Sequence, residues 1–260
     1  YKPILFIIII FSLISAACLV SGTSDNTTTE VTEEQVVPAT EQVVVVQPTQ
    51  AVVAPTEAVV VPTEEYVAPE NEPQAYFTEQ FDGDLSNWTW FMMSGDENKM
   101  DLYTEGGYLV FDLEGEEQYV YVMYDPYTYT DVKIEVSAEN RGKNTNNVSL
   151  ICNYSEKYGW YEFSITNGGM FYIYVYSELD GGYDLLASGG SQNVVTGRHE
   201  NTYTATCEGN QLALYVNGHL EYEMKDNHYN LTEGQVGFGV SSFSVLPIIV
   251  YVNYVDISAY

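Results

Sequence analysis

The sequence has few basic residues and few histidines. Eight Lys and Arg stand against 37 Asp and Glu, which gives a formal net charge of −29. A surface with that field repels phosphate backbones, so we expect no nucleic-acid partner, and it repels anionic lipid headgroups as well. The histidines His199, His219 and His228 fall in or beside apparent turns. No catalytic motif surrounds them, and we interpret them as solvated loop residues.

Long amphipathic helical patterns are also missing, whereas strand-forming residues are abundant. The chain has 24 Tyr and 20 Gly among many Val, Ile and Thr, and β-branched and aromatic side chains pack well on a pleated surface. From residue 76 onward, short apolar or alternating runs recur between Gly, Asn and Asp. The spacing predicts an all-β domain over residues 76–260, a jelly-roll sandwich of two antiparallel sheets.

The individual strands are predicted from these runs. They are expected near residues 76–82, 100–103, 107–113, 118–124, 131–138, 147–154, 159–166, 170–176, 183–187, 201–208, 211–217, 220–224, 234–241 and 247–258.

Residues 1–22 are separable from that domain. One Lys precedes an apolar run that ends in small residues at Cys18, which is the layout of a secretory signal. The run Ser15-Ala16-Ala17-Cys18 resembles a bacterial lipobox, whose Cys is lipidated, although that motif prefers Leu, Val or Ile where Ser15 stands. We expect an extracellular protein at the cell surface, membrane-anchored only through its N-terminus. A plain signal peptide and a retained anchor remain as alternatives.

Residues 23–75 have a different composition from the rest of the chain. The segment has no basic residue and contains spaced prolines, with units such as APTEAVV and VPTEEYV. Proline opposes helix, and carboxylates without counter-charge repel one another. The segment is predicted to be a disordered linker that carries the domain away from the membrane.

Cysteine is scarce, with 3 in the chain. If Cys18 carries lipid, Cys152 and Cys207 remain as a pair in a compartment that permits disulfides. Strand alternation gives both an apolar neighbourhood. A disulfide and two small buried hydrophobes are both open.

Several stretches carry a family resemblance. CEGNQLALYVNGHLEYEMKD, then YNLTEGQVGFGVSSF and the final VDISAY, resemble the last third of laminin-G-like, concanavalin A-like jelly-roll domains of secreted bacterial proteins. FTEQFDGDLSNW resembles the opening strand of that family and SLICNYSEKYGWYEFSI its central hairpin. The resemblance covers most of residues 76–260 and extends to 3-keto-disaccharide hydrolase-type domains. It implies no single function, because this fold carries lectins, glycosidases, adhesion modules and spacers.

The family resemblance also suggests a catalytic motif and a metal site. Glucanases of this fold carry two Glu and an Asp alternating on one strand, whereas IEVSAEN has Ser137 in place of the Asp, which argues against that mechanism. Family members often tie the opening segment to the closing strand through a metal. Asp82, Asp84 and Asp256 match those places, and oxygen ligands suit Ca²⁺. The resemblance therefore implies a structural calcium ion.

A candidate binding face comes from the hairpin at residues 159–176. Tyr161 and Phe163 alternate with Trp160 and Glu162, so one face belongs to the core and the other is free. The free face and the preceding strand supply the predicted ligand-binding residues Trp160, Glu162, Tyr172, Tyr174, Tyr176 and Asn153. Aromatic rings with one carboxylate suit a sugar. Cross-strand aromatic pairs also stabilise a sheet by themselves, so a purely structural role remains open.

The sequence thus predicts a non-catalytic surface module that recognises a carbohydrate or a neighbouring surface protein. A self-associating adhesin is one alternative, and it predicts a broad contact surface. A glycoside hydrolase-like enzyme is another, and it predicts a pocket with two carboxylates about 5 to 10 Å apart.

Overall fold

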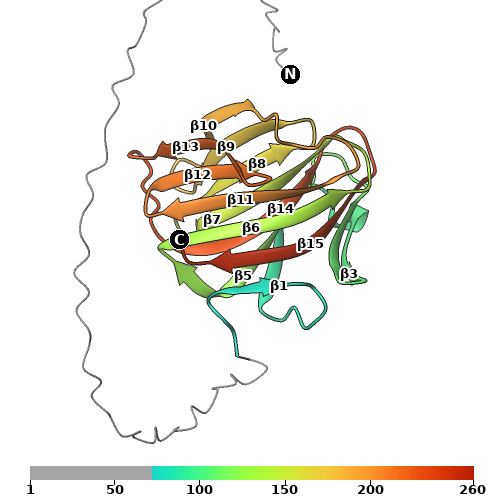
Figure 1. The fold of residues 1–260 in the computed structure, drawn as a ribbon, viewed down its shortest axis with the longest axis horizontal. Helices are drawn as coiled ribbons and strands as arrows, with labels where there is room; N and C mark the ends of the chain where they lie inside the picture. The colour runs from blue at the N-terminus through green and yellow to red at the C-terminus, as the bar shows by residue number, and fades with distance from the viewer. Residues whose placement is uncertain (1–71) are drawn as a thin grey trace, which may run out of the picture. The chain divides into compact units, whose positions relative to one another are not determined.

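The computed structural model describes residues 72–260 as two antiparallel sheets packed face to face (Figure 1). The predicted signal segment with Cys18, and the linker as far as residue 71, lie outside the described residues. None of the helical structure within 72–260 has the length and apolar character needed to cross a membrane. The predicted all-β jelly-roll sandwich is confirmed.

The described part of the chain contains fifteen strands and one short 3₁₀ helix, η1, at Glu97–Lys99. The strands are β1 Phe77–Glu79, β2 Trp88–Ser94, β3 Met100–Glu105, β4 Tyr108–Leu113, β5 Tyr119–Tyr129, β6 Asp131–Asn140, β7 Asn146–Ser155, β8 Gly159–Thr166, β9 Met170–Ser177, β10 Gly182–Gly190, β11 Glu200–Glu208, β12 Gln211–Val216, β13 His219–Lys225, β14 Gly234–Ser242 and β15 Ile248–Ser258.

The strand order brings distant segments of the chain together. The eight-stranded sheet runs β13-β12-β11-β6-β15-β4-β3, with β1 paired to β15. The seven-stranded sheet runs β10-β9-β8-β7-β14-β5-β2. In the second sheet β14 lies between β7 and β5, so a late strand joins two early ones (Figure 1).

The core fills the space between the two sheets, and strand alternation decides which side chains enter it. On β8, Tyr161, Phe163 and Ile165 are buried in this core, and on β9 Phe171 and Ile173 join them. Successive side chains of a strand point to opposite faces. The intervening residues of β8 and β9 therefore face outward from the seven-stranded sheet.

A disulfide joins Cys152 on β7 to Cys207 on β11, with 6.6 Å between the Cα atoms. Both residues are fully buried, and the bond links one sheet to the other. Of the two readings that the sequence left open, the disulfide is confirmed.

Strand β2 was missed by the sequence pattern. Its residues Trp88–Ser94 read WTWFMMS, and their burial does not alternate strictly. The pairing of β2 with β5 shifts register between Met92 and Ser94. Such a bulge breaks the two-residue period by which strands are recognised.

Hydrogen bonds hold the first described residues against the sandwich. The hydroxyls of Tyr124, Tyr127 and Tyr129 on β5 donate hydrogen bonds of 2.7–3.0 Å to the backbone carbonyls of residues 73–75. These bonds fix the start of the described segment against β5 of the seven-stranded sheet.

Candidate functional site

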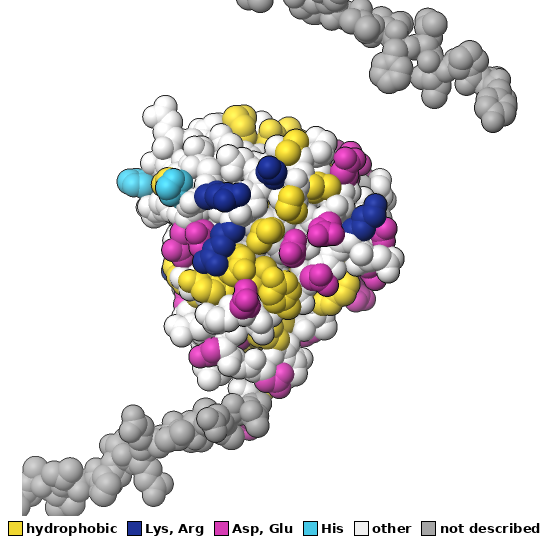
Figure 2. Space-filling view, turned by 90° about the vertical axis from the view of Figure 1, so that its right-hand side faces the viewer, with side chains coloured by type: hydrophobic (Ala, Val, Ile, Leu, Met, Phe, Trp, Pro, Cys, Tyr) yellow, Lys and Arg dark blue, Asp and Glu magenta, His cyan; other side chains and the backbone are white. Residues whose placement is uncertain are grey.

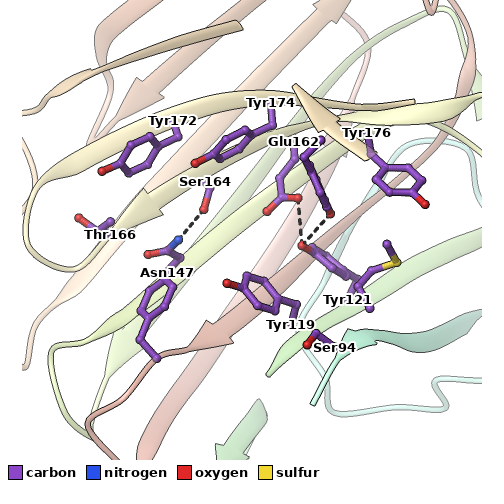
Figure 3. A pocket seen from close by; sticks show the side chains of 13 residues that line it. Ser94, Tyr119, Tyr121, Asn147, Glu162, Ser164, Thr166, Tyr172, Tyr174 and Tyr176 are labelled. Carbon is purple, nitrogen blue, oxygen red and sulfur yellow. Dashed lines mark hydrogen bonds between the residues drawn. The ribbon is translucent and has the colours of Figure 1, made fainter. Parts of the chain in front are cut away.

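A pocket of about 730 Å³ lies on the outer face of the seven-stranded sheet (Figure 3). Most of its lining is aromatic and comes from β5, β8, β9 and β10. The lining residues are Met93, Ser94, Tyr119, Tyr121, Asn147, Glu162, Ser164, Thr166, Tyr172, Tyr174, Tyr176, Tyr183 and Phe243. The pocket therefore lies on the face that the alternation of the hairpin left free.

Strand register explains why this face is hollow. Tyr121, Gly239, Ser149, Ser164 and Tyr172 stand opposite one another in a single row across β5, β14, β7, β8 and β9. The three central residues of this row are small, and the two outer ones are tyrosines. A row with small residues at its centre and rings at its ends makes a floor between two walls.

Two glycines on β14 leave room for side chains of the neighbouring strand β5. A Cβ atom on Gly239 would lie 2.6 Å from Cδ1 of Tyr121, and one on Gly237 would lie 2.4 Å from Sδ of Met123. Both distances are shorter than real Cβ contacts allow. The glycines of the GQVGFGV segment thus let side chains of β5 lie across β14.

Trp160 packs behind the lining of the pocket and does not form part of it. It is 3 % exposed, packs in a small outer cluster with Tyr121, Met123 and Ile151, and does not line the pocket. Its indole stacks on the ring of Tyr176, with 4.3 Å between centroids and 19° between planes. Trp160 therefore holds Tyr176 in place and presents no free face to a ligand.

The tyrosines of β9 form one wall, as Figure 3 shows for Tyr172, Tyr174 and Tyr176. The rings of Tyr172 and Tyr174 stack at 5.8 Å. Tyr183 from β10 stands edge-on to Tyr174 at 5.9 Å and to Tyr176 at 5.0 Å. Three predicted ligand-binding tyrosines thus come together, with Tyr183 as an unpredicted fourth.

Glu162 is the single carboxylate of the lining, and it is 4 % exposed. Tyr121 donates a 2.9 Å hydrogen bond to its Oε2, and Ser149 donates one of 2.7 Å to its Oε1. The Tyr183 hydroxyl lies 3.3 Å from that of Tyr121, and Ser149 Oγ lies 3.2 Å from Ser164 Oγ. The carboxylate is thus held directly by hydroxyl groups from β5 and β7, and the β10 hydroxyl of Tyr183 reaches this network through Tyr121.

Burial sets the protonation behaviour of this group. Loss of water raises the pKa of Glu162, although the hydrogen bonds from Ser149 and Tyr121 oppose the rise. Burial also raises the pKa of Tyr121 and of Tyr183, and the nearby Glu162 charge raises both further. Ionisation of Glu162 and ionisation of these two tyrosines therefore oppose one another.

A second polar group of the pocket is only partly satisfied. Asn147 donates a 2.8 Å hydrogen bond from Nδ2 to Ser164 Oγ (Figure 3). Its Oδ1 is buried and accepts no hydrogen bond. Leaving a buried acceptor unpaired costs about 1–3 kcal/mol.

Asn153 does not join this group. It lies at a register shift between Cys152 and Ser155, with φ at 54°, so strand alternation does not hold there. Its Nδ2 donates to the carbonyls of Gly209 and Leu231. Asn153 ties loops together and does not line the pocket.

The three predicted calcium ligands do not converge. Asp84 accepts a hydrogen bond from the Ser86 amide. Asp256 accepts one from Thr78 and lies 3.8 Å from the Lys133 ammonium. Within residues 72–260 no group of three or more acidic, histidine or cysteine side chains is arranged to hold a metal ion. A set made of Asp82, Asp84 and Asp256 thus does not fit calcium here, and the ion itself stays a prediction.

The acidic strand β6 lies in the other sheet from the pocket. Glu135 accepts hydrogen bonds from Thr204 and Tyr254, and Glu139 pairs with Arg141 at 2.6 Å. Ser137 donates to a further carboxylate on β11. These groups are engaged in contacts within their own sheet and do not meet Glu162.

Sequence reasoning missed Tyr119, Tyr121, Tyr183 and Asn147. Alternation in YVYVMY puts Tyr119 and Tyr121 on one face, opposite the core residues of β5, and this signal was available. The sequence did not show that only β7 and β14 lie between β5 and β8, because that order depends on the late strand β14.

The sequence matches no protein-family model and no curated protein. Solved structures share its fold. A galectin-like protein of unknown function from Bacillus subtilis aligns with TM-score 0.55 and 11% identity, covering 72% of this chain and 97% of its own. A β-glucanase from Bacillus licheniformis aligns with TM-score 0.53 and 16% identity, over 73% and 100% of the two chains.

A carbohydrate-binding module from Bacillus subtilis aligns with TM-score 0.47 and 14% identity, over 64% of this chain and 94% of its own. That similarity is too weak to argue from. Together with the sheet order, the other two alignments define the class: a concanavalin A-like or galectin-like β-sandwich. Enzymes and binding proteins share this fold, so function must be argued from the pocket.

Proposed function

We propose that the protein is a non-catalytic carbohydrate-binding module of the cell surface. The observation that carries the proposal is the pocket, in which stacked tyrosines of β9 stand beside one buried carboxylate. A sugar ring offers an apolar C–H face to an aromatic ring and hydroxyl donors at its edge. The pocket offers a partner for each.

The size of the pocket agrees with this function. Small-molecule sites occupy about 300–1,000 Å³, are mostly apolar and carry a few convergent polar groups. The pocket has about 730 Å³, and its polar groups include Glu162, Asn147 and Ser164. Hydroxyl groups on several tyrosine rings add adaptable hydrogen bonding at the wall.

The absence of a second carboxylate in the lining argues against hydrolysis. Glycosidases that use paired carboxylates hold them about 5 to 10 Å apart across the scissile bond. Glu162 is the one acidic side chain among the described residues that line the pocket. Because a β-glucanase shares the fold, assay of glucan hydrolysis is the direct check on this part of the proposal.

The proposed location rests on the N-terminal sequence and on the disulfide. A fully buried disulfide between Cys152 and Cys207 is typical of proteins in oxidising compartments. We propose export through the N-terminal signal and attachment by lipid at Cys18. Mass spectrometry of the membrane fraction would detect the lipid on that residue, and an unmodified thiol would contradict the attachment.

A glycan array probed with the full chain, with and without calcium, tests the function. Binding to a defined glycan is expected, together with its loss in Y174A, which removes a ring from the wall. The matched control is Y158A, because Tyr158 is exposed in a turn outside the pocket. Failure of the chain to bind any glycan, or equal binding by Y174A, would contradict the proposal.

One observation favours a second function, contact with another protein surface. Trp90 on β2 and Tyr103 on β3 are 45 % and 41 % exposed and line the same hollow outside the main pocket. Figure 2 looks onto the side where Figure 1 shows β3, and hydrophobic side chains gather there among acidic ones. Large exposed apolar patches often mark interaction sites. Assembly that rises with concentration and is lost in W90S, without any glycan binding, would favour this adhesin function.

A further inference from the structure

We infer that the ligand of the pocket carries a protonated amine, as a saccharide with an unsubstituted amino group does. The inference rests on the proposed carbohydrate function and specifies its ligand class. Charge, hydrogen-bonding capacity and aromatic geometry each support it separately.

The first argument is the missing counter-charge. None of the described residues that line the pocket is Lys, Arg or His. The ion pairs found among residues 72–260 involve Lys133 and Arg141, and neither contacts Glu162. A buried carboxylate is costly unless it is paired. A cationic ligand would supply the charge that the protein leaves out.

The second argument is a count of donors and acceptors. A carboxylate offers about four acceptor sites, and Glu162 uses one on each oxygen, for Ser149 and Tyr121. Asn147 Oδ1 is buried without a partner, while its Nδ2 already donates to Ser164. Glu162 therefore keeps acceptor capacity for donors from a ligand. An ammonium group has three donors and no acceptor.

The third argument is the aromatic wall. The rings of Tyr172, Tyr174, Tyr176 and Tyr183 line the same pocket as Glu162. In the sheet, Tyr174 stands directly opposite Glu162, and Tyr172 stands opposite Ser164. The negative face of an aromatic ring attracts a cation within about 6 Å of its centroid. Rings and a carboxylate together favour a cation over a neutral group of equal size.

Acidic saccharides are disfavoured for the same reasons. A carboxylate, sulfate or phosphate in this pocket would meet the charge of Glu162 with no basic side chain in the lining to offset it. Neutral saccharides would use the tyrosine rings and would gain nothing from the charge. We therefore expect basic saccharides to bind most tightly, neutral saccharides less tightly and acidic saccharides least tightly.

The test is calorimetric titration of the full chain with four probes. Three are tetramers of one linkage, made of glucosamine, N-acetylglucosamine and glucose, and the fourth is tetramethylammonium. The glucosamine tetramer is expected to bind at least about tenfold more tightly than the two neutral tetramers. This comparison uses the unaltered protein, so it remains decisive if a variant fails to fold.

Two variants locate the effect. In E162Q the preference for glucosamine should fall to within about twofold, because the charge is gone while the shape is kept. E139Q should keep the preference, since Glu139 pairs with Arg141 in the other sheet. Retention of the preference in E162Q would overturn the inference.

The outcomes also separate this inference from the proposed function. Equal binding of charged and neutral tetramers would overturn the inference and leave the carbohydrate function standing. Binding of tetramethylammonium alone, abolished in E162Q, would support a cation site and overturn the carbohydrate function. Binding of no probe would overturn the inference, and the glycan array would then decide the function.

Discussion

Tyr121 donates a 2.9 Å hydrogen bond to Glu162 although β14 and β7 lie between their strands. The bond crosses the sheet because the row between the two walls contains Gly239 and Ser149. The bond fixes the position of the Glu162 carboxylate relative to the Tyr121 side of the pocket. The pocket is therefore a property of the whole sheet, and changes far from the ligand should alter it.

Replacement of Trp160 is expected to destabilise the fold and not only the site. Because Trp160 is buried and stacked on Tyr176, W160A should cost about 3–5 kcal/mol of unfolding free energy. W160F keeps a ring and should cost about 1–2 kcal/mol. Urea unfolding measures both, with Y158A as an exposed control expected within about 0.5 kcal/mol. A cost for W160A no larger than for Y158A would refute a supporting role.

The β8–β9 hairpin shows which features of the site strand alternation predicts and which it does not. It correctly separates Phe171 and Ile173, which enter the core, from Tyr172 and Tyr174, which line the pocket. It does not tell how deeply an outward residue is covered, and so Trp160 was expected at the surface. Depth depends on neighbours such as Tyr121, which reach Trp160 from a strand that the sequence does not place.

Irregular backbone limited the remaining predictions. Asn153 lies at a bulge, where the period of two that assigned it to the ligand face is broken. The predicted calcium ligands came from a family resemblance that fixes positions along the chain and not the directions of side chains. Sheet order and local bulges are set by contacts between distant segments. Those contacts cannot be predicted from the residue pattern of one sequence.

The disulfide between Cys152 and Cys207 is expected to contribute strongly to stability. It joins residues 55 apart in sequence and links the two sheets. Closing a loop of that length corresponds to about 4 kcal/mol in the chain-entropy account. The variant C152A/C207A should lose about that much in urea unfolding, and the reduced wild type should behave alike. Equal midpoints for oxidised and reduced protein would show that the bond adds nothing.

Gly239 is expected to tolerate no side chain. A Cβ there would lie 2.4 Å from the Val120 carbonyl oxygen and 2.6 Å from the Tyr121 ring. G239A should cost at least about 1–3 kcal/mol and should weaken ligand binding, because Tyr121 must move away from Glu162. G83A is the matched control, since a Cβ on Gly83 meets nothing within 4 Å. If G239A and G83A had the same stability and affinity, the role assigned to β14 would be wrong.

Glu162 should make the stability of the ligand-free protein depend on pH in a direction opposite to that of Asp226. Burial raises the pKa of Glu162 from 4.5, so the folded state holds its proton more tightly than the unfolded state does. Its contribution is then fully present below pH 4.5 and is lost as pH rises through the folded-state pKa. E162Q lacks this titration. Its unfolding free energy, relative to that of the wild type, should therefore increase as pH rises through the same interval.

Asp226 supplies the control for that experiment. Burial opposes its ionisation, but hydrogen bonds from Tyr161 and from three backbone amides outweigh burial and lower its pKa from 3.8. Its contribution is present above pH 3.8 and is lost as pH falls, so D226N should lose most against the wild type near neutrality. The tyrosines that face Glu162 have pKa values raised above 10 and do not titrate in this range. Urea midpoints of E162Q and wild type that run parallel from pH 4.5 to neutrality would therefore show that Glu162 is not held in a buried, unpaired state.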